Sequence, residues 1–311
     1  MTVEQAAIIH RAKPLSRQSA PLLEFRLKLI DFNSRPPIPA FKPNASHLLN
    51  YRQIYKASEA EVSKEMEGDA LANYLAAYDR VGAARVVIKA KDVETTFGIK
   101  ASNEAIAEFC AGHGDRFIGW AGVDPNKGMA ALREFEHAVR ELGLRGLNLQ
   151  CFEHRLAIND KRMYPLYAKC VELDVPVNIH SSINFSTDCL MEHGRPLLLD
   201  EVMVHFPELR VIASPPGWPW VHELIGVAWR HRNVYIGVSA VRPKYLDVDN
   251  SGYEALLQYG NTVLQDRMIF GTSFPMQPVE RAVAEMMELP LKEGVREKWM
   301  YGNAARLLGV D

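Results

Sequence analysis

"INDKRMYPLYAKCVELDVPVNIH", residues 158–180, joins the two patterns that decide the fold. Leu166, Cys170 and Leu173 repeat at helical spacing, and Asn159 or Asp160 is the expected cap of that helix. The run VPVNIH at 175–180 is short, apolar and rich in branched residues, which is typical of a buried strand. A helix followed by such a strand is the repeating unit of a parallel sheet.

The same kind of apolar run occurs eight times along the chain. The eight runs are LKLIDF (27–32), RVVIKA (85–90), RFIGWAGV (116–123), LRGLNLQ (144–150), VPVNIH (175–180), LRVIAS (209–214), NVYIGVS (233–239) and RMIFGT (267–272). Amphipathic stretches lie between them, with helical repeats at 71–78 and 132–142. Eight parallel strands with crossover helices close a TIM barrel, whereas an open doubly wound sheet would favour a Gly-x-Gly-x-x-Gly after the first strand, which is absent. We therefore predict an α/β protein with a (β/α)8 TIM barrel, whose active site lies at the carboxyl ends of the strands.

Composition and charge exclude several classes of protein. The chain has 311 residues, 48% of them apolar, and a formal charge of −2 without a basic stripe, which argues against nucleic acid as a partner. No apolar run reaches the roughly 18 residues that span a bilayer, and the first residues lack the order of a signal peptide. The four cysteines form no Cys-x-x-Cys pair and are expected to be reduced thiols. These features predict a cytoplasmic protein without a membrane partner.

Two segments stand apart from the repeating pattern. Residues 1–25 show no clear periodicity and are expected to form an N-terminal arm that packs on the barrel or reaches a neighbouring subunit. Residues 26–311 are expected to form the barrel as one domain. After the first strand, residues 36–65 form a long connection whose four early prolines oppose a helix. Connections of this length are usually functional or lid-like.

Polar residues follow most of the predicted strands, at the end where a barrel carries its active site. Lys89 also belongs to this end, although its long stem could carry the amine to solvent. Histidine and carboxylate are scarce there, so the candidates are mainly amides, hydroxyls and cations. The candidate catalytic residues are Asn33, Arg35, His180 and Ser273, and the candidate substrate-binding residues are Asn148, Gln150, Trp218 and Ser239.

Five motifs together resemble the amidohydrolase-related family, in the branch that holds aromatic-acid decarboxylases and similar hydrolases. They are IDFNSRPP (30–37), the stretch at 158–180, GWPWVHE (217–223), GTSFP (271–275) and YGNAARLLG (301–309). The resemblance runs from about residue 27 to the C-terminus. It implies a metal site with a His-x-His pair on the first strand, a histidine on each of the fifth and sixth strands, and an aspartate on the eighth.

This sequence departs from that pattern at four of the five positions. The His-x-His pair falls on Asn33 and Arg35, the sixth-strand histidine falls near Pro215, and the aspartate falls on Ser273, while His180 keeps the fifth-strand histidine. Arginine does not deprotonate in proteins, proline has no donor atom, and a hydroxyl replaces a carboxylate poorly. We therefore expect no metal cofactor. A divalent metal held through His180, with help from Cys151, Glu153 or His154, is the less favoured alternative.

Two hypotheses of function follow. In the first, the chain is an enzyme that acts on a small compound bearing a carboxylate or carbonyl, by hydrolysis or decarboxylation. Arg35 would bind the anion, Asn33 would stabilise an oxyanion, and His180 would move a proton, with Ser273 as a less favoured nucleophile. In the second, the chain is a silent subunit that binds and stabilises a metal-bearing relative. The expected partners are thus a small molecule and either further copies of the chain or a related barrel.

Overall fold

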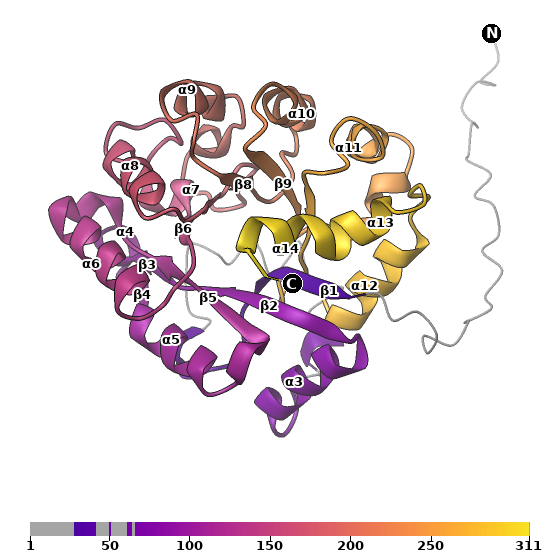
Figure 1. Cartoon of the computed structure of the whole chain (residues 1–311), viewed down its shortest axis with the longest axis horizontal. Coiled ribbons are helices and arrows are strands. Elements are labelled where there is room, and N and C mark those ends of the chain that lie inside the picture. The colour runs from indigo at the N-terminus through magenta and orange to yellow at the C-terminus, as the bar shows by residue number, and fades with distance from the viewer. Residues whose placement is uncertain (1–27, 42–49, 51–60, 64–65, 311) are drawn as a thin grey trace, which may run out of the picture.

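The structure, a computed structural model, describes residues 28–41, 50, 61–63 and 66–310. Eight parallel strands form one sheet, in chain order around a barrel (Figure 1). The strands are β1 Leu29–Ser34, β2 Ala83–Lys89, β5 Phe117–Gly122, β6 Leu147–Leu149, β7 Val177–Ile179, β8 Val211–Ala213, β9 Val234–Val238 and β10 Met268–Phe270. Each lies within one of the predicted runs or overlaps it. The predicted (β/α)8 TIM barrel is therefore confirmed.

The barrel closes between its first and last strands around the buried carboxylate of Asp31. One Asp31 oxygen accepts the backbone N–H groups of Asn33 and Thr272, each at 2.9 Å. The other accepts the hydroxyls of Thr272 at 2.6 Å and Tyr78 at 2.5 Å. Just beyond, Ser34 bridges Phe274 in parallel, and Arg35 N donates to Phe274 O at 3.0 Å. Asp31 thus joins β1 to the end of β10.

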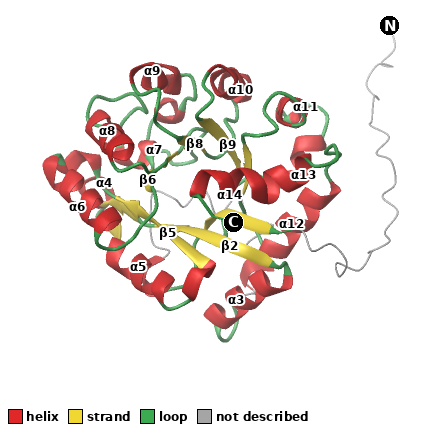
Figure 2. Ribbon diagram, viewed as in Figure 1, coloured by secondary structure: helices red, strands yellow, loops and turns green. Residues whose placement is uncertain are grey.

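Helices cover the outside of the barrel (Figure 2). In β2, Val86 and Ile88 belong to the apolar layer between strands and helices, whereas Val87 belongs to the apolar interior of the barrel. This alternation follows from the two-residue period of a strand. The longer helices are α3 Ala70–Arg80, α5 Asn103–Ala111, α6 Met129–Arg140, α8 Tyr164–Glu172, α9 Leu198–His205, α10 Val221–Arg230, α11 Glu254–Gly260 and α12 Val279–Glu288.

The amino end of the barrel is filled with apolar side chains. The short helix α14 Asn303–Leu308, which follows α13 Val295–Glu297 and a π-helix at Lys298–Gly302, adds Ala304 and Leu308 to the interior cluster that contains Ile30 and Trp120. Gly146 permits the packing of Trp120, because a Cβ at that position would overlap the indole ring. The interior is therefore closed at this end, and polar side chains are left to the other end.

Two local features differ from the sequence-based predictions or were missed by them, and a third prediction lies mostly outside the described residues. A small antiparallel hairpin, β3 Lys91–Val93 with β4 Ile99–Ala101 around the short helix α4 Glu94–Phe97, follows β2 and was not predicted. The predicted cap of α8 is wrong: the cap is Met163, and the Asp160 carboxylate instead accepts from Arg162. The predicted arm at 1–25 and most of the 36–65 connection lie outside the described residues, apart from pieces such as a 3-10 turn at Pro39–Phe41.

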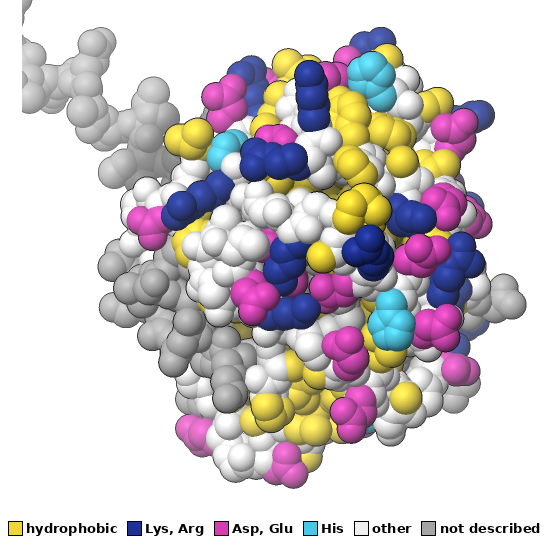
Figure 3. Space-filling model, turned by 90° about the vertical axis from the view of Figure 1, so that its left-hand side faces the viewer, with side chains coloured by type: hydrophobic (Ala, Val, Ile, Leu, Met, Phe, Trp, Pro, Cys, Tyr) yellow, Lys and Arg dark blue, Asp and Glu magenta, His cyan; other side chains and the backbone are white. Residues whose placement is uncertain are grey.

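The surface carries both signs of charge. On the face shown in Figure 3, basic, acidic and apolar side chains are intermixed. Among the helices that the structure describes, none is long and apolar enough to cross a bilayer. The four cysteines are free thiols.

Candidate active site

His180 stands directly after β7, at the carboxyl end of the barrel. Its backbone N–H donates to Leu149 O at 3.1 Å, and its ring lies 4.6 Å from that of Phe152 in the short helix α7 Cys151–His154. The residue is 6% exposed, and its Nδ1 is buried without a hydrogen-bond partner among the described residues. Burial lowers the pKa of His180 to about 4, so the imidazole is neutral at pH 7. The ring is therefore held by packing, and its Nδ1 has no hydrogen-bond partner among the described residues.

Asn33 and Ser273, which the sequence places at opposite ends of the chain, lie in direct contact. Asn33 Nδ2 donates to Ser273 Oγ at 2.6 Å, and Ser273 N donates to Asn33 O at 2.6 Å. Ser273 has a φ of 59°, in the left-handed region that non-glycine residues rarely adopt. Such strained positions are concentrated at functional sites. The contact brings two of the four predicted catalytic residues together.

Arg35 directly follows β1. Its backbone is fixed by the bond to Phe274. Its positive charge is one of the influences that lower the pKa of Lys89. The predicted cation is thus present at this end of the barrel.

Amide side chains of the predicted substrate-binding set form one network across β6 and β7. Asn148 Oδ1 accepts from Asn178 Nδ2 at 2.9 Å and from Gln150 Nε2 at 3.2 Å. Asn178 Oδ1 accepts from Lys89 Nζ at 3.1 Å, so Lys89 is buried in the barrel rather than extended to solvent. Asn178 was not among the predicted residues, although it stands two residues before His180 and therefore on the same face of the strand.

The two remaining candidates have different surroundings. Ser239, after β9, lies 2.5 Å from Ser214 after β8, hydroxyl to hydroxyl. Trp218 contributes through its backbone, since its carbonyl accepts from Ile183 N at 2.7 Å and from Ser182 Oγ at 2.9 Å. Its side chain packs against the apolar core. Trp218 therefore shapes the loop that follows His180.

A second polar cluster lies next to this end, around α7 and the loop after β5. Glu153 is 2% exposed and pairs with Lys91 at 2.8 Å. His154 Nδ1 lies 3.9 Å from Asp124 Oδ1, and burial lowers the pKa of His154 to about 4. Asp124 itself accepts from the backbone and hydroxyl of Thr95. These groups stabilise the hairpin and loops beside the barrel.

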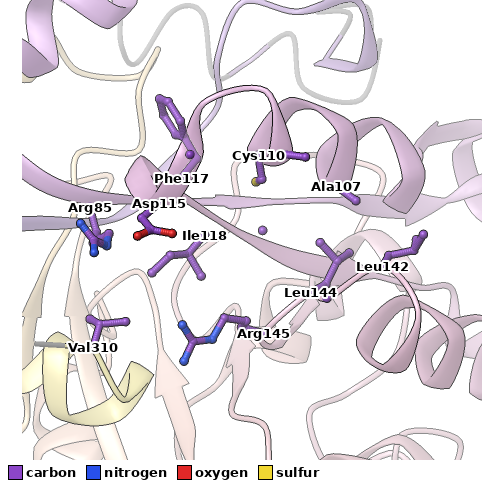
Figure 4. A pocket seen from close by; sticks show the side chains of 14 residues that line it. Arg85, Ala107, Cys110, Asp115, Phe117, Ile118, Leu142, Leu144, Arg145 and Val310 are labelled. Atoms are coloured by element: carbon purple, nitrogen blue, oxygen red, sulfur yellow. The ribbon is translucent and has the colours of Figure 1, made fainter.

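A cavity of about 530 Å³ lies at the other end of the strands (Figure 4). Its labelled walls include Arg85 and Ile118, near the starts of β2 and β5, and Arg145 and Val310 near the start of β6 and the end of α14. In TIM barrels this face contributes to stability, whereas the carboxyl ends carry the chemistry. The polar residues at the carboxyl ends therefore remain the candidate active site.

The sequence places the chain in a known protein family. The sequence profile described as amidohydrolase matches residues 51–310, so the chain belongs to the amidohydrolase family. Among curated proteins, γ-resorcylate decarboxylase of Rhodococcus jostii (strain RHA1) is 28% identical over 255 residues, which cover 68% of this chain and 76% of that one.

Solved structures agree on the fold. An uncharacterized TIM-barrel protein from Bordetella bronchiseptica superimposes with a TM-score of 0.76 and 30% identity, over 91% of this chain and 99% of that one. A 2,6-dihydroxybenzoate decarboxylase complexed with 2,6-dihydroxybenzoate gives a TM-score of 0.62 over 91% and 99% of the two chains. At 18% identity, this second likeness shows the fold alone.

The prediction that no cofactor takes part is contradicted by relatives that contain a metal. Manganese is bound in dihydroxybenzoic acid decarboxylase from Polaromonas, with a TM-score of 0.60 and 18% identity over 91% and 96% of the chains. Manganese is also bound in 5-carboxyvanillate decarboxylase from Novosphingobium aromaticivorans. That structure has a TM-score of 0.62 and 16% identity, over 93% of this chain and 97% of that one. The error lay in judging metal use only from the residues that align with the ligands.

The described side chains do not, however, form a ligand set for manganese. Among the residues that the structure places, no group of three or more His, Cys, Asp or Glu could hold a metal ion. The residues considered for a rebuilt site are otherwise engaged or buried: Glu153 pairs with Lys91, and burial raises the pKa of the Cys151 thiol to about 12. The chemistry below is therefore assigned only to side chains of this chain.

The two buried histidines predict a loss of stability in mild acid. Their pKa values of about 4 in the folded protein lie below the roughly 6.5 of an unfolded chain. Between these pH values the unfolded state binds more protons, so the free energy of unfolding decreases as the pH falls. The stabilisation is complete above about pH 6.5 and is lost as the pH falls through about 4, roughly 3 kcal/mol for each histidine.

Urea unfolding, followed by circular dichroism at a series of pH values, measures this effect. A His154→Leu variant should lose about half of the part of the pH dependence that the two histidines contribute, because one of them is removed. A midpoint that stays constant from neutral pH down to about pH 4 would contradict the assignment of both histidines as buried and neutral.

Proposed function

We propose that this protein is a decarboxylase that acts on a small aromatic carboxylate. The curated relatives with detectable similarity are decarboxylases, with γ-resorcylate decarboxylase of Rhodococcus jostii at 28% identity. Hydrolysis, the other reaction that the sequence suggested, has no counterpart among the names of these relatives. The silent-subunit alternative, the oligomeric partners and the cytoplasmic location stay predictions from the sequence.

The observation that carries this proposal is that two basic side chains, Arg35 and Lys89, lie near each other at the carboxyl end of the barrel. Lys89 and Arg35 are close enough that the charge of Arg35 lowers the pKa of Lys89. The acid nearest in the network, Asp31, already accepts four hydrogen bonds from its own strand, from Thr272 and from Tyr78. A guanidinium binds a carboxylate through two parallel hydrogen bonds, so Arg35 is the group proposed to hold the acid.

His180 supports the proton transfer that decarboxylation requires. When carbon dioxide leaves an aromatic acid, a proton must replace it on the ring carbon. The neutral imidazole has a buried nitrogen without a partner among the described groups, and an anion bound beside it raises its pKa towards neutrality. His180 can then take up a proton and pass it on. Asn33, held against Ser273, is the candidate donor for the ligand's oxygen atoms.

Replacement of Arg35 tests the proposed anion site. We expect Arg35→Met to weaken binding of 2,6-dihydroxybenzoate by about tenfold to a hundredfold, because a charged hydrogen bond contributes roughly 1.5–3 kcal/mol. Arg35→Lys should recover little, since a point charge lacks the planar fork of the guanidinium. Isothermal titration calorimetry measures the affinity.

The matched control is Arg140→Met, which removes an exposed arginine of α6 that pairs with Glu136. It should leave the affinity unchanged. Equal affinities for the wild type and Arg35→Met would remove Arg35 from the site, and no binding by the wild type of this or a related aromatic acid would overturn the proposed function.

A further inference from the structure

Lys89 places an amine inside the barrel, in contact with no carboxylate of the described residues. The residue ends β2, is 5% exposed, and holds its Nζ 4.0 Å from the ring centroid of Phe32 and 5.9 Å from that of Trp120. The amine donates to Asn178 Oδ1 at 3.1 Å. No carboxylate in the described part of the chain lies within 4.0 Å of it. A lysine in such surroundings differs from Lys91, two residues on, which pairs with Glu153.

The amide network limits the hydrogen bonds that the amine of Lys89 can donate. Asn178 donates through Nδ2 to Asn148, and Asn148 donates through Nδ2 to Ala90 O at 2.9 Å. Each amide nitrogen is thus engaged, so Asn178 presents its oxygen to the amine. One acceptor satisfies one N–H group, whereas an ammonium has three and a neutral amine has two and a lone pair. The surroundings therefore suit the neutral amine better than the ammonium ion.

The charges around Lys89 also favour the neutral amine. Burial lowers the pKa of Lys89 well below its usual value; the charge of Asp31 opposes that shift, and the charge of Arg35 adds to it. Asp31 gives little direct help, because its two oxygens already accept four hydrogen bonds. A desolvated lysine beside another cation is a known way to obtain a nucleophilic amine at neutral pH.

This inference goes beyond the proposed function and assigns a second substrate class to the same end of the barrel. We propose that Lys89 is a catalytic residue whose amine forms a Schiff base with the ketone of a 3-oxo carboxylate. Arg35 would bind the carboxylate of that ligand, as proposed above for an aromatic acid. The aromatic rings of Phe32 and Trp120 would face the apolar part of the ligand.

The reaction balances with water and protons alone. The lone pair of Nζ attacks the ketone carbon, a C–N bond forms, and the ketone oxygen leaves as water after taking two protons, one from the amine and one from solvent. In the resulting iminium ion the bond to the carboxylate breaks, carbon dioxide leaves, and the electron pair moves to the nitrogen. The enamine takes a proton on carbon, and water then releases the ketone and restores the amine.

Reductive trapping tests the proposal on the full-length protein. Acetoacetate is the probe, and sodium borohydride supplies the hydride that converts an iminium ion into a stable secondary amine. Digestion and mass spectrometry then locate the adduct. We expect it on the peptide that contains Lys89, and we expect none with 2,6-dihydroxybenzoate, which has no ketone.

Two variants sharpen the result. Lys89→Met should lose the adduct, whereas Lys91→Met should keep it at Lys89. If Lys89→Met does not fold, the peptide map of the wild type still identifies the modified lysine. An unmodified Lys89, or labelling spread evenly over exposed lysines such as Lys161, would overturn the proposal.

The experiment also separates this proposal from the proposed function. Release of carbon dioxide from 2,6-dihydroxybenzoate without any acetoacetate adduct would retain the aromatic-acid decarboxylase and overturn the role of Lys89. An adduct on Lys89, without turnover of any aromatic acid, would retain the role of Lys89 and overturn the aromatic-acid decarboxylase.

Discussion

An Asp31→Ala variant should lose about 3 to 5 kcal/mol of its free energy of unfolding, because a buried, multiply hydrogen-bonded charged group is removed. Four donors lose their acceptor at once: two backbone N–H groups, at Asn33 and Thr272, and the hydroxyls of Thr272 and Tyr78. Burial raises the pKa of Asp31, and the four hydrogen bonds oppose that rise. The carboxylate is thus an integral part of the closure between β1 and β10.

Urea unfolding at pH 7 measures the loss, with Tyr78→Phe as the matched control. That variant removes a single donor and should cost only about 1 to 2 kcal/mol. Asp31→Asn should fall between the two, since the amide keeps the shape and one acceptor oxygen. If Asp31→Ala were as stable as Tyr78→Phe, the closure would depend on the backbone bridge between Ser34 and Phe274 rather than on the carboxylate.

A His180→Gln variant should lose about a hundredfold to ten-thousandfold in the rate of decarboxylation, which is the usual contribution of general acid–base catalysis. The imidazole of His180 packs against Phe152 at the carboxyl end of the barrel. One of its nitrogen atoms has no hydrogen-bond partner among the described residues. Glutamine approximates the shape but does not titrate, so binding should change less than the rate.

The assay follows the absorbance of 2,6-dihydroxybenzoate, and circular dichroism checks the fold. His205→Gln on α9 is the control, because His205 is exposed and ends a helix that precedes β8 rather than following the carboxyl end of a strand. It should keep the full rate. Full activity of His180→Gln in an active wild-type background would show that another group transfers the proton.

The barrel could be predicted because its signal is repeated. Each strand is a short run of branched residues that packs on both faces, as Val86, Val87 and Ile88 do in β2. The hairpin of β3 and β4 was missed because its three-residue strands carry lysines and an aspartate between their apolar residues, which gives no such run. The cap of α8 was misplaced because Arg162 competes for the carboxylate of Asp160.

The candidate site could be predicted in part. The positions of Asn33 and Ser273 after the first and last strands place both at the carboxyl end of a barrel, and a hydrogen bond joins them; their catalytic roles stay predictions. The burial of Lys89 could not be predicted, since it depends on Asn178 and Phe32, which come from two other strands. Metal use could not be decided from the substituted ligand positions, and that prediction was wrong.

The bonds from Asp31 to Thr272 also bear on how the chain acquires its structure during synthesis. The two residues are 241 positions apart, so the carboxylate near the start of the chain has no chance to gain its last two donors until almost all of the chain has left the ribosome. Contacts of such long sequence separation form late and slowly. A chain that is interrupted before β10 would leave β1 with an open edge and Asp31 exposed to water. Such a chain would be prone to aggregation or degradation.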